Sequence, residues 1–151
     1  MQPSSPPQDP AGGQEVIAAN AGFYAAFEAL DLGAMSLVWS ERDPISCVHP
    51  GWALVAGRAA VLASWAGIFR GTERIKFSVR DPQVFVGAGV AWVVLIEEIQ
   101  AQQGDKVVHA YAHATNLFVL ENGAWRLVHH HAAPTSAPLP AETGAPKRTL
   151  H

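Results

Sequence analysis

The stretch from His109 to Pro134 reads HAYAHATNLFVLENGAWRLVHHHAAP, two long β-like runs joined at Asn122-Gly123. An Asn-Gly pair between runs of alternating apolar residues is the strongest short-range signal for a β-hairpin. A strand of roughly a dozen residues spans about 40 Å. Strands of this length predict the centre of a sheet that curves around other elements, and the helices expected upstream supply those elements.

Three helices are predicted before this hairpin. Apolar residues recur at three- and four-residue steps over residues 14–30, the pattern of an amphipathic helix. A short helix is expected over residues 34–39, with Asp31 as its candidate N-terminal cap. A third helix is expected to open at Gly57-Arg58 and to end at Gly71.

Most of the remaining chain has the character of strands. A short strand at 45–49 and an extended piece at 52–56 are predicted between the helices, and further strands at 75–79, 83–86 and 90–100 precede the hairpin. Helices that come first and strands that follow predict an α+β domain, with the helices packed on one face of an antiparallel sheet.

Composition and charge narrow the class of protein. A chain of 151 residues that is 49% apolar and 15% charged suits one domain. We predict that this domain spans residues 14–136, between a disordered N-terminal tail at 1–13 and a flexible C-terminal tail at 137–151. No cluster of lysine or arginine is present, which argues against nucleic acid as a partner. No secretory signal or membrane span is recognisable, so we expect a cytoplasmic protein that does not bind membranes.

The chain resembles the SnoaL-like proteins of the nuclear transport factor two-like superfamily. The resemblance rests on Ala29–Gly33, on Val48–Gly51 followed by Gly57-Arg58, on Ala91–Val93, and most specifically on Asn122–His131. The last segment is also similar to the end of the association domain of calcium/calmodulin-dependent kinase. The resemblance implies a cone-shaped, strongly curved antiparallel sheet closed by three N-terminal helices. It also implies an enclosed, largely apolar pocket on the concave side and a homodimer through the convex face.

Two registers of the hairpin remain open, and they place different side chains on the concave face. A two-residue turn at Asn122-Gly123 puts Asn116 and Phe118 on the same face as Leu127, His129 and His131. A three-residue loop with Gly123 in a bulge puts them with Val128 and His130 instead. Similarity to the kinase association domain favours the second arrangement, with Asn116, Phe118 and His130 facing inward.

The preceding strand must point one of two adjacent glutamates inward and the other outward. The resemblance places Trp92 and Glu98 inward and leaves Glu97 outward. A carboxylate in an apolar cavity has a raised pKa and can act as an acid or base near neutral pH. The alternative is that both glutamates lie in water at the end of the strand.

Candidate catalytic residues are His49, Glu98 and His130. The resemblance places His49 at the mouth of the pocket, where an imidazole can exchange protons with a carboxylate. The competing interpretation is a structural histidine that only donates a hydrogen bond. We find no match for the paired aspartates of steroid isomerases or the Asp-Arg-Asp set of epoxide hydrolases.

Aromatic residues are numerous for one small domain, and most must lie in the core. Tyr24, Trp39 and Trp65, on helices that close the cone, are expected to line the pocket as an apolar wall with polar tips. Ala110, Ala112 and Ala114 leave room either for a cavity or for closer helix packing. The full set predicted to bind a ligand is Tyr24, Trp39, Trp52, Trp65, Phe69, Trp92, Asn116 and Phe118.

The histidines also raise the question of a metal site. His129 and His131 share a strand face and could bind zinc with His113 from the next strand. In the resembling family, however, three histidines end the last strand without implying a metal, so we expect neither a metal nor a cofactor. The single cysteine, Cys47, is expected to be a buried strand residue.

Two functional hypotheses follow. The first is a domain that binds a small apolar or aromatic molecule, with an enzyme version that catalyses cofactor-independent proton transfer as a lyase or isomerase of dehydratase, isomerase or cyclase type. The alternative is a non-catalytic ligand-sensing or assembly module that forms homodimers.

Overall fold

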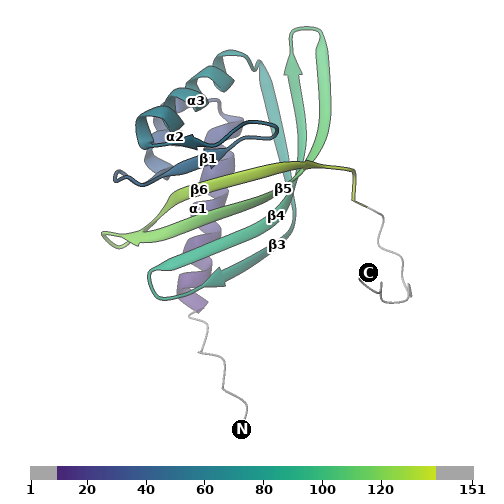
Figure 1. The fold of residues 1–151 in the computed structure, drawn as a ribbon. Coiled ribbons are helices and arrows are strands. Elements are labelled where there is room, and N and C mark those ends of the chain that lie inside the picture. The colour runs from purple at the N-terminus through teal and green to yellow at the C-terminus, as the bar shows by residue number, and fades with distance from the viewer. Residues whose placement is uncertain (1–9, 139–151) are drawn as a thin grey trace, which may run out of the picture.

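The computed structural model describes residues 10–138 (Figure 1). These residues form three helices and six strands. In chain order they are α1 (Pro10–Glu28), α2 (Leu32–Val38), β1 (Ser46–Val48), β2 (Val55–Ala56), α3 (Arg58–Arg70), β3 (Arg74–Val86), β4 (Val90–Gln103), β5 (Lys106–Glu121) and β6 (Ala124–Thr135).

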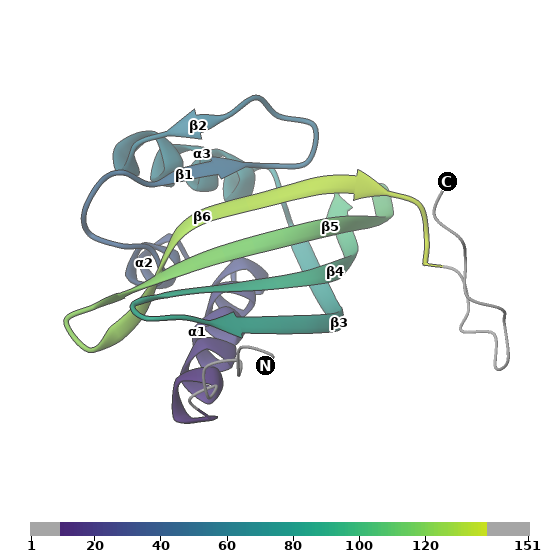
Figure 2. The ribbon, with the colours of Figure 1, turned by 60° about the horizontal axis from the view of Figure 1, so that its bottom comes forward.

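All six strands belong to one sheet, in the order β2-β1-β6-β5-β4-β3 (Figure 2). Neighbouring strands are antiparallel except for β1 and β6, which are parallel. The sheet curves, and α1 crosses behind strands β3 to β6 (Figure 1). The predicted α+β architecture, a cone-shaped antiparallel sheet closed by three N-terminal helices, is confirmed.

The helices follow the local signals in the sequence. Helix α1 begins at Pro10, four residues before the predicted start at Gln14. The predicted tails otherwise lie outside the described residues, apart from 137 and 138. Asp31 caps α2 as expected, because its Oδ1 accepts a hydrogen bond from the backbone N–H of Ala34 at 3.1 Å. No helix within residues 10–138 is long and apolar enough to cross a membrane.

Strand β3 is continuous over Arg74–Val86, where two separate strands at 75–79 and 83–86 were predicted. Its pairing with β4 shifts register between Arg80 and Gln83, the position of Asp81-Pro82. Proline has no N–H to donate and is tolerated at bulges of edge strands, and β3 is an edge strand. Asp81-Pro82 therefore bends the strand without ending it.

The β5–β6 hairpin combines features of both registers considered above. Asn122 and Gly123 have φ values of 50° and 80° and connect Glu121 to Ala124, so the turn has two residues. Beyond the turn Phe118 lies opposite Leu127, but Leu117 lies opposite His129, so the strand carries one extra residue at Val128. The bulge lies within β6 rather than in the loop.

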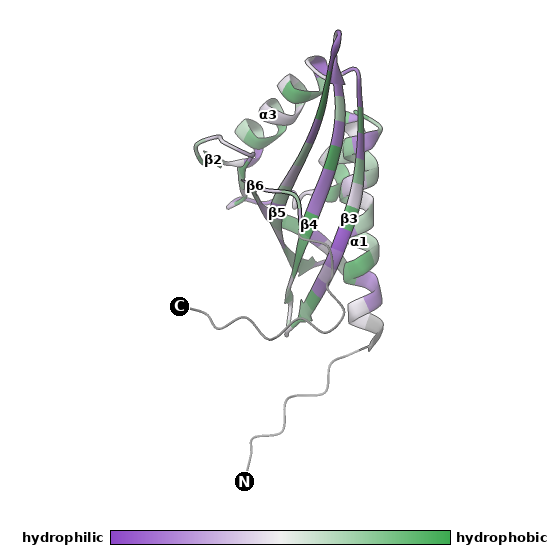
Figure 3. Cartoon of the chain, turned by 90° about the vertical axis from the view of Figure 1, so that its right-hand side faces the viewer, coloured by the Kyte–Doolittle hydropathy of each residue, from purple (hydrophilic) through white to green (hydrophobic). Residues whose placement is uncertain are grey.

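This bulge brings the expected side chains to the concave face. Asn116, Phe118 and His130 are each no more than 1% exposed, which confirms their inward direction. Hydrophobic and hydrophilic residues follow one another along the strands (Figure 3), as expected for a sheet with one covered face. The centre beneath the helices is filled by large side chains, including Phe23, Trp39 and Trp65.

Candidate functional site

A chain of hydrogen-bonded polar side chains crosses the buried interior. The hydroxyl of Tyr24 on α1 donates to Glu97 Oε2 at 2.7 Å and accepts from Asn116 Nδ2 at 3.2 Å. The same amide nitrogen donates to Asn20 Oδ1 at 2.8 Å. Asn116 Oδ1 lies 2.6 Å from His130 Nδ1. The chain thus joins α1 to β4, β5 and β6.

The directions of these bonds set the tautomer of His130. Because Asn116 Nδ2 donates both of its hydrogens, Asn116 Oδ1 must accept from His130, and Nδ1 therefore carries a hydrogen. His130 is fully buried, and burial lowers its pKa to about 3, with the nearby His49 adding a smaller repulsion. His130 is therefore neutral at pH 7.

Among these hydrogen-bonded side chains, Glu97 is the group that titrates near neutral pH. It is 1% exposed, and burial raises its pKa to about 7, although the hydrogen bond from Tyr24 acts in the opposite direction. Burial, together with the charge of Glu97, raises the pKa of Tyr24 well above its usual value. Glu97 can therefore gain or lose a proton at pH 7 while Tyr24 keeps its own.

A pocket of about 500 Å³ lies between α1 and β3, and two of the hydrogen-bonded side chains, Asn20 and Tyr24, line it. Its walls are mainly apolar, formed by residues that include Ile17, Ala21, Ala25, Phe77, Val84 and Val93, and its polar groups are Asn20, Tyr24 and Glu28. Ile17 is 54% and Val79 38% exposed, so the pocket is open to solvent rather than enclosed. Tyr24 therefore both lines the pocket and donates a hydrogen bond to Glu97.

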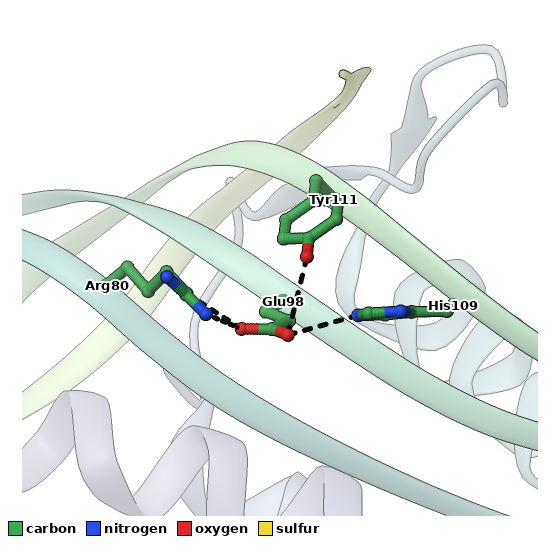
Figure 4. A network of polar contacts seen from close by, with 4 residues as sticks. All are labelled: Arg80, Glu98, His109 and Tyr111. Atoms are coloured by element: carbon green, nitrogen blue, oxygen red, sulfur yellow. Dashed lines mark hydrogen bonds and ion pairs between the residues drawn. The ribbon is translucent and has the colours of Figure 1, made fainter. Parts of the chain in front are cut away.

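Glu98 points away from this pocket, and the inward direction predicted for it is wrong. It lies on the outer face of the sheet, where Arg80 Nε donates to Oε2 at 2.7 Å and His109 Nε2 lies 3.0 Å from Oε1 (Figure 4). A second contact from Arg80 and a long one from Tyr111 complete the cluster. The hydrogen bonds from Arg80 and His109 lower the pKa of Glu98, and the bond from Arg80 has the larger effect.

Trp92 also points outward, contrary to prediction, because it shares the face of Glu98. It is 39% exposed and stacks on Phe85 with ring centroids 5.3 Å apart. The physical reason is the two-residue alternation of β4, in which Glu97 is opposite Ala112 and Glu98 is opposite Tyr111. The small Ala112 side chain leaves space beneath α1 for the inward carboxylate.

His49 is buried near His130 rather than exposed at a pocket mouth. It is 2% exposed and packs edge-to-face against Trp65, with centroids 4.6 Å apart. Its Nε2 donates to Ser64 Oγ at 2.9 Å, since that hydroxyl donates its own hydrogen to the Val61 carbonyl. Burial lowers the pKa of His49 to about 4. The three residues predicted to be catalytic therefore do not converge, because Glu98 lies on the opposite face of the sheet.

The other residues predicted to bind a ligand lie in two environments. Five of them are buried, namely Trp39, Trp65, Phe69, Asn116 and Phe118. Trp52 is 49% exposed and packs beside His49. Of the predicted set only Tyr24 lines the described pocket, and the three alanines of β5 do not. Neither Trp39 Nε1 nor Trp65 Nε1 has a hydrogen-bond partner among the described residues. A role for these residues in binding stays a prediction.

Two members of the buried chain, Asn20 and Glu97, were not identified from the sequence. Asn20 precedes Tyr24 by four residues, about one helical turn, so the two side chains lie on the same face of the helix. Because Tyr24 was expected to line the pocket, this spacing could have identified Asn20 as a second polar residue there. The signal for Glu97 was the small Ala112 that faces it across the ladder. That signal requires the β4–β5 register, which the sequence did not establish.

The cysteine and the remaining histidines of residues 10–138 are not grouped as metal ligands would be. Cys47 is fully buried as expected, and burial raises the pKa of its thiol to about 12. His129 Nδ1 lies 2.7 Å from Ser46 Oγ, which ties β6 to β1. Within residues 10–138 no three histidine, cysteine, aspartate or glutamate side chains are grouped as metal ligands would be.

Comparison with known proteins identifies solved structures that are similar to this one in fold and sequence. A candidate dehydratase of the NTF2-like family from Streptomyces avermitilis has a TM-score of 0.79 and 35% identity, with 84% of this chain and 98% of that one covered. A candidate calcium/calmodulin-dependent protein kinase type II association domain from Thiobacillus denitrificans has a TM-score of 0.68 and 36% identity, covering 80% and 94%.

The F-box protein SKIP8 of Arabidopsis thaliana is 27% identical over 118 residues, which are 78% of this chain and 48% of that protein. The chain thus spans about half the length of this relative. The model of the SnoaL-like domain family matches residues 16–138, nearly the whole described region. The chain therefore belongs to the SnoaL-like domain family of the NTF2-like (nuclear transport factor two-like) superfamily.

Proposed function

We propose that this domain binds a small, largely apolar molecule between α1 and β3 and moves a proton on that molecule with the Tyr24–Glu97 pair, without a cofactor. The observation that carries the proposal is the position of Tyr24. Its side chain lines the pocket, and its hydroxyl bonds at 2.7 Å to a buried carboxyl whose pKa is about 7. An acid or base with a pKa near the working pH is the most effective in proton transfer.

The geometry suggests a relay in which no proton is gained or lost overall. The Tyr24 oxygen takes a proton from a ligand carbon as its own proton passes to the ionised Glu97 carboxylate. The reverse transfer returns a proton to a neighbouring ligand atom, which gives an isomer, or to a leaving hydroxyl, which departs as water. Asn116 Nδ2 holds the Tyr24 oxygen in place, and His130 holds Asn116.

The relative from Streptomyces avermitilis, a candidate dehydratase, supports a reaction of this class. A direct test is exchange of the α-protons of 2-tetralone, an apolar bicyclic ketone, in heavy water, followed by NMR. We expect the protein to accelerate exchange and Glu97→Gln to reduce that acceleration by roughly 10²-fold or more.

Glu98→Gln is the matched control, because it removes the neighbouring carboxylate on the opposite face of the sheet. It should exchange 2-tetralone protons as fast as the wild type. Exchange no faster than in buffer, or equal loss in both variants, would contradict the proposed proton transfer.

The alternative, a non-catalytic assembly module, is favoured by a different surface. Phe85 and Trp92 stack on the outer face of the sheet and are 38% and 39% exposed, and Val90, two residues before Trp92 on the same face, is also exposed. Partly exposed aromatic residues are enriched where proteins associate. The relative that is a candidate association domain supports this second proposal, a homodimer through the convex face.

Light scattering during size-exclusion chromatography tests the dimer. We expect the wild type to have the mass of two chains and Trp92→Glu to have the mass of one. Trp52→Glu, which changes a more exposed tryptophan outside this surface, should leave the dimer intact. A monomeric wild type, or a dimer that survives Trp92→Glu, would rule this interface out.

A further inference from the structure

The pocket between α1 and β3 has an uneven distribution of charge. Apart from the neutral Asn20 and Tyr24, its polar lining is the carboxylate of Glu28. Among the described residues that line it there is no lysine, arginine or histidine. A ligand that enters therefore meets only neutral and negative groups.

The Glu28 carboxylate is fixed in the wall of the pocket. Its Oε1 accepts a hydrogen bond from the backbone N–H of Phe77 at 2.8 Å, which joins the last residue of α1 to the strand opposite. The C-terminal end of a helix also carries partial negative charge. The carboxylate and the helix end thus create negative potential at the same end of the pocket.

The arginine next to the lining residue Val79 does not offset this potential. Arg80 lies on the outer face of the sheet and is paired there with Glu98 (Figure 4). Its charge is directed away from the pocket by the same alternation that separates Glu97 from Glu98. The negative end of the pocket therefore has no cationic partner in its lining.

We infer that the pocket takes apolar molecules that are uncharged or positively charged and rejects carboxylates and phosphates of similar size. The inference rests on the proposed ligand-binding function and adds the charge class of the ligand to it. An anion that enters an apolar site loses hydration and here finds no cation in return. An ammonium group, in contrast, can pair with Glu28.

Three naphthalene probes of similar size and different charge test the inference: 2-naphthylmethylammonium, 2-naphthol and 2-naphthoate, titrated by calorimetry at pH 7 and low salt. We expect the ammonium probe to bind roughly fivefold more tightly than the naphthol, and the naphthoate about tenfold more weakly. Added salt should reduce both differences, because Glu28 is exposed.

Glu28→Gln isolates the contribution of the charge. Glutamine keeps an oxygen for the Phe77 N–H, so the wall of the pocket should be preserved while the ammonium probe loses its advantage. Glu15→Gln, at an exposed position of α1 outside the lining, should leave the preference unchanged. Equal binding of naphthol and naphthoate to the wild type, or an unaltered preference in Glu28→Gln, would overturn the inference.

A bulky substitution separates this inference from the function on which it rests. Ala25→Trp fills the pocket and should abolish binding of all three probes, whereas Ala18→Trp, exposed on α1 outside the lining, should not. If the wild type binds none of the probes, the ligand-binding proposal fails and the inference fails with it. If it binds all three equally, only the charge class is wrong.

Discussion

Two adjacent glutamates of β4 differ in chemistry because they lie on opposite faces of one strand. Glu97 is buried beneath α1, and its pKa is raised to about 7 by loss of hydration. Glu98 accepts hydrogen bonds from Arg80 and His109 on the outer face, and its pKa is lowered. The sequence could predict that the two residues diverge, but not which of them faces inward, because a shift of one residue exchanges the faces.

Glu97 and the buried histidines have opposite effects on stability as the pH changes. Below pH 4.5 the raised pKa of Glu97 stabilises the folded state fully, and this stabilisation is lost as the pH rises through about 7. The lowered pKa values of His49 and His130 stabilise the folded state above pH 6.5, and that contribution is lost as the pH falls toward about 4 and about 3. Between pH 4.5 and 6.5 these three groups together therefore bind one proton more in the unfolded chain than in the folded protein.

In that pH range we expect these three groups to lower the free energy of unfolding of the wild type by about 1.4 kcal/mol for each pH unit of acidification. Glu97→Gln removes the opposing group, so the fall should be roughly twice as steep. His130→Gln removes one histidine, so the dependence should be nearly flat. Urea unfolding at several pH values measures these slopes, and the same slope in all three proteins would show that these groups do not carry the pH dependence.

Two glycines in different elements should respond in opposite ways to substitution by alanine, because their backbone conformations differ. Gly22 lies in the middle of α1, where an added Cβ meets no atom within 4 Å, whereas Gly123 has a φ of 80° in the β5–β6 turn. Gly22→Ala should stabilise the protein by about 0.5–1 kcal/mol, because alanine loses less backbone entropy in a helix. Gly123→Ala should destabilise it by about 1 kcal/mol, because the turn needs a positive φ.

Urea midpoints of the two alanine variants, compared with the wild type, test this pair. A loss of stability in Gly22→Ala, or none in Gly123→Ala, would contradict the assigned conformations. The Asn-Gly turn itself was predictable, because both of its residues tolerate a positive φ. The bulge at Val128 was not, because no residue of β6 signals it and it depends on how the strand bends around the helices.

At the scale of the whole molecule, the order of helices and strands was sufficient to predict an α+β domain with helices on one face of an antiparallel sheet, whereas the cone shape was implied by the resemblance to SnoaL-like proteins. The position of the pocket was not predictable, because it depends on how completely the aromatic residues fill the cone. Trp39, Trp65 and Phe23 occupy the centre and are fully buried. The described pocket lies at the edge of the sheet instead, between α1 and β3, where one buried hydroxyl connects it to Glu97.

The pH dependence of 2-tetralone proton exchange tests the role of the Tyr24–Glu97 pair most directly. A base that acts in its ionised form should give a rate that rises with pH and levels off above the pKa of Glu97, about 7. The same rise should be present in Glu98→Gln and absent in Glu97→Gln. A protein-dependent rate without an inflection near pH 7, or an inflection that persists in Glu97→Gln, would contradict proton transfer through Glu97.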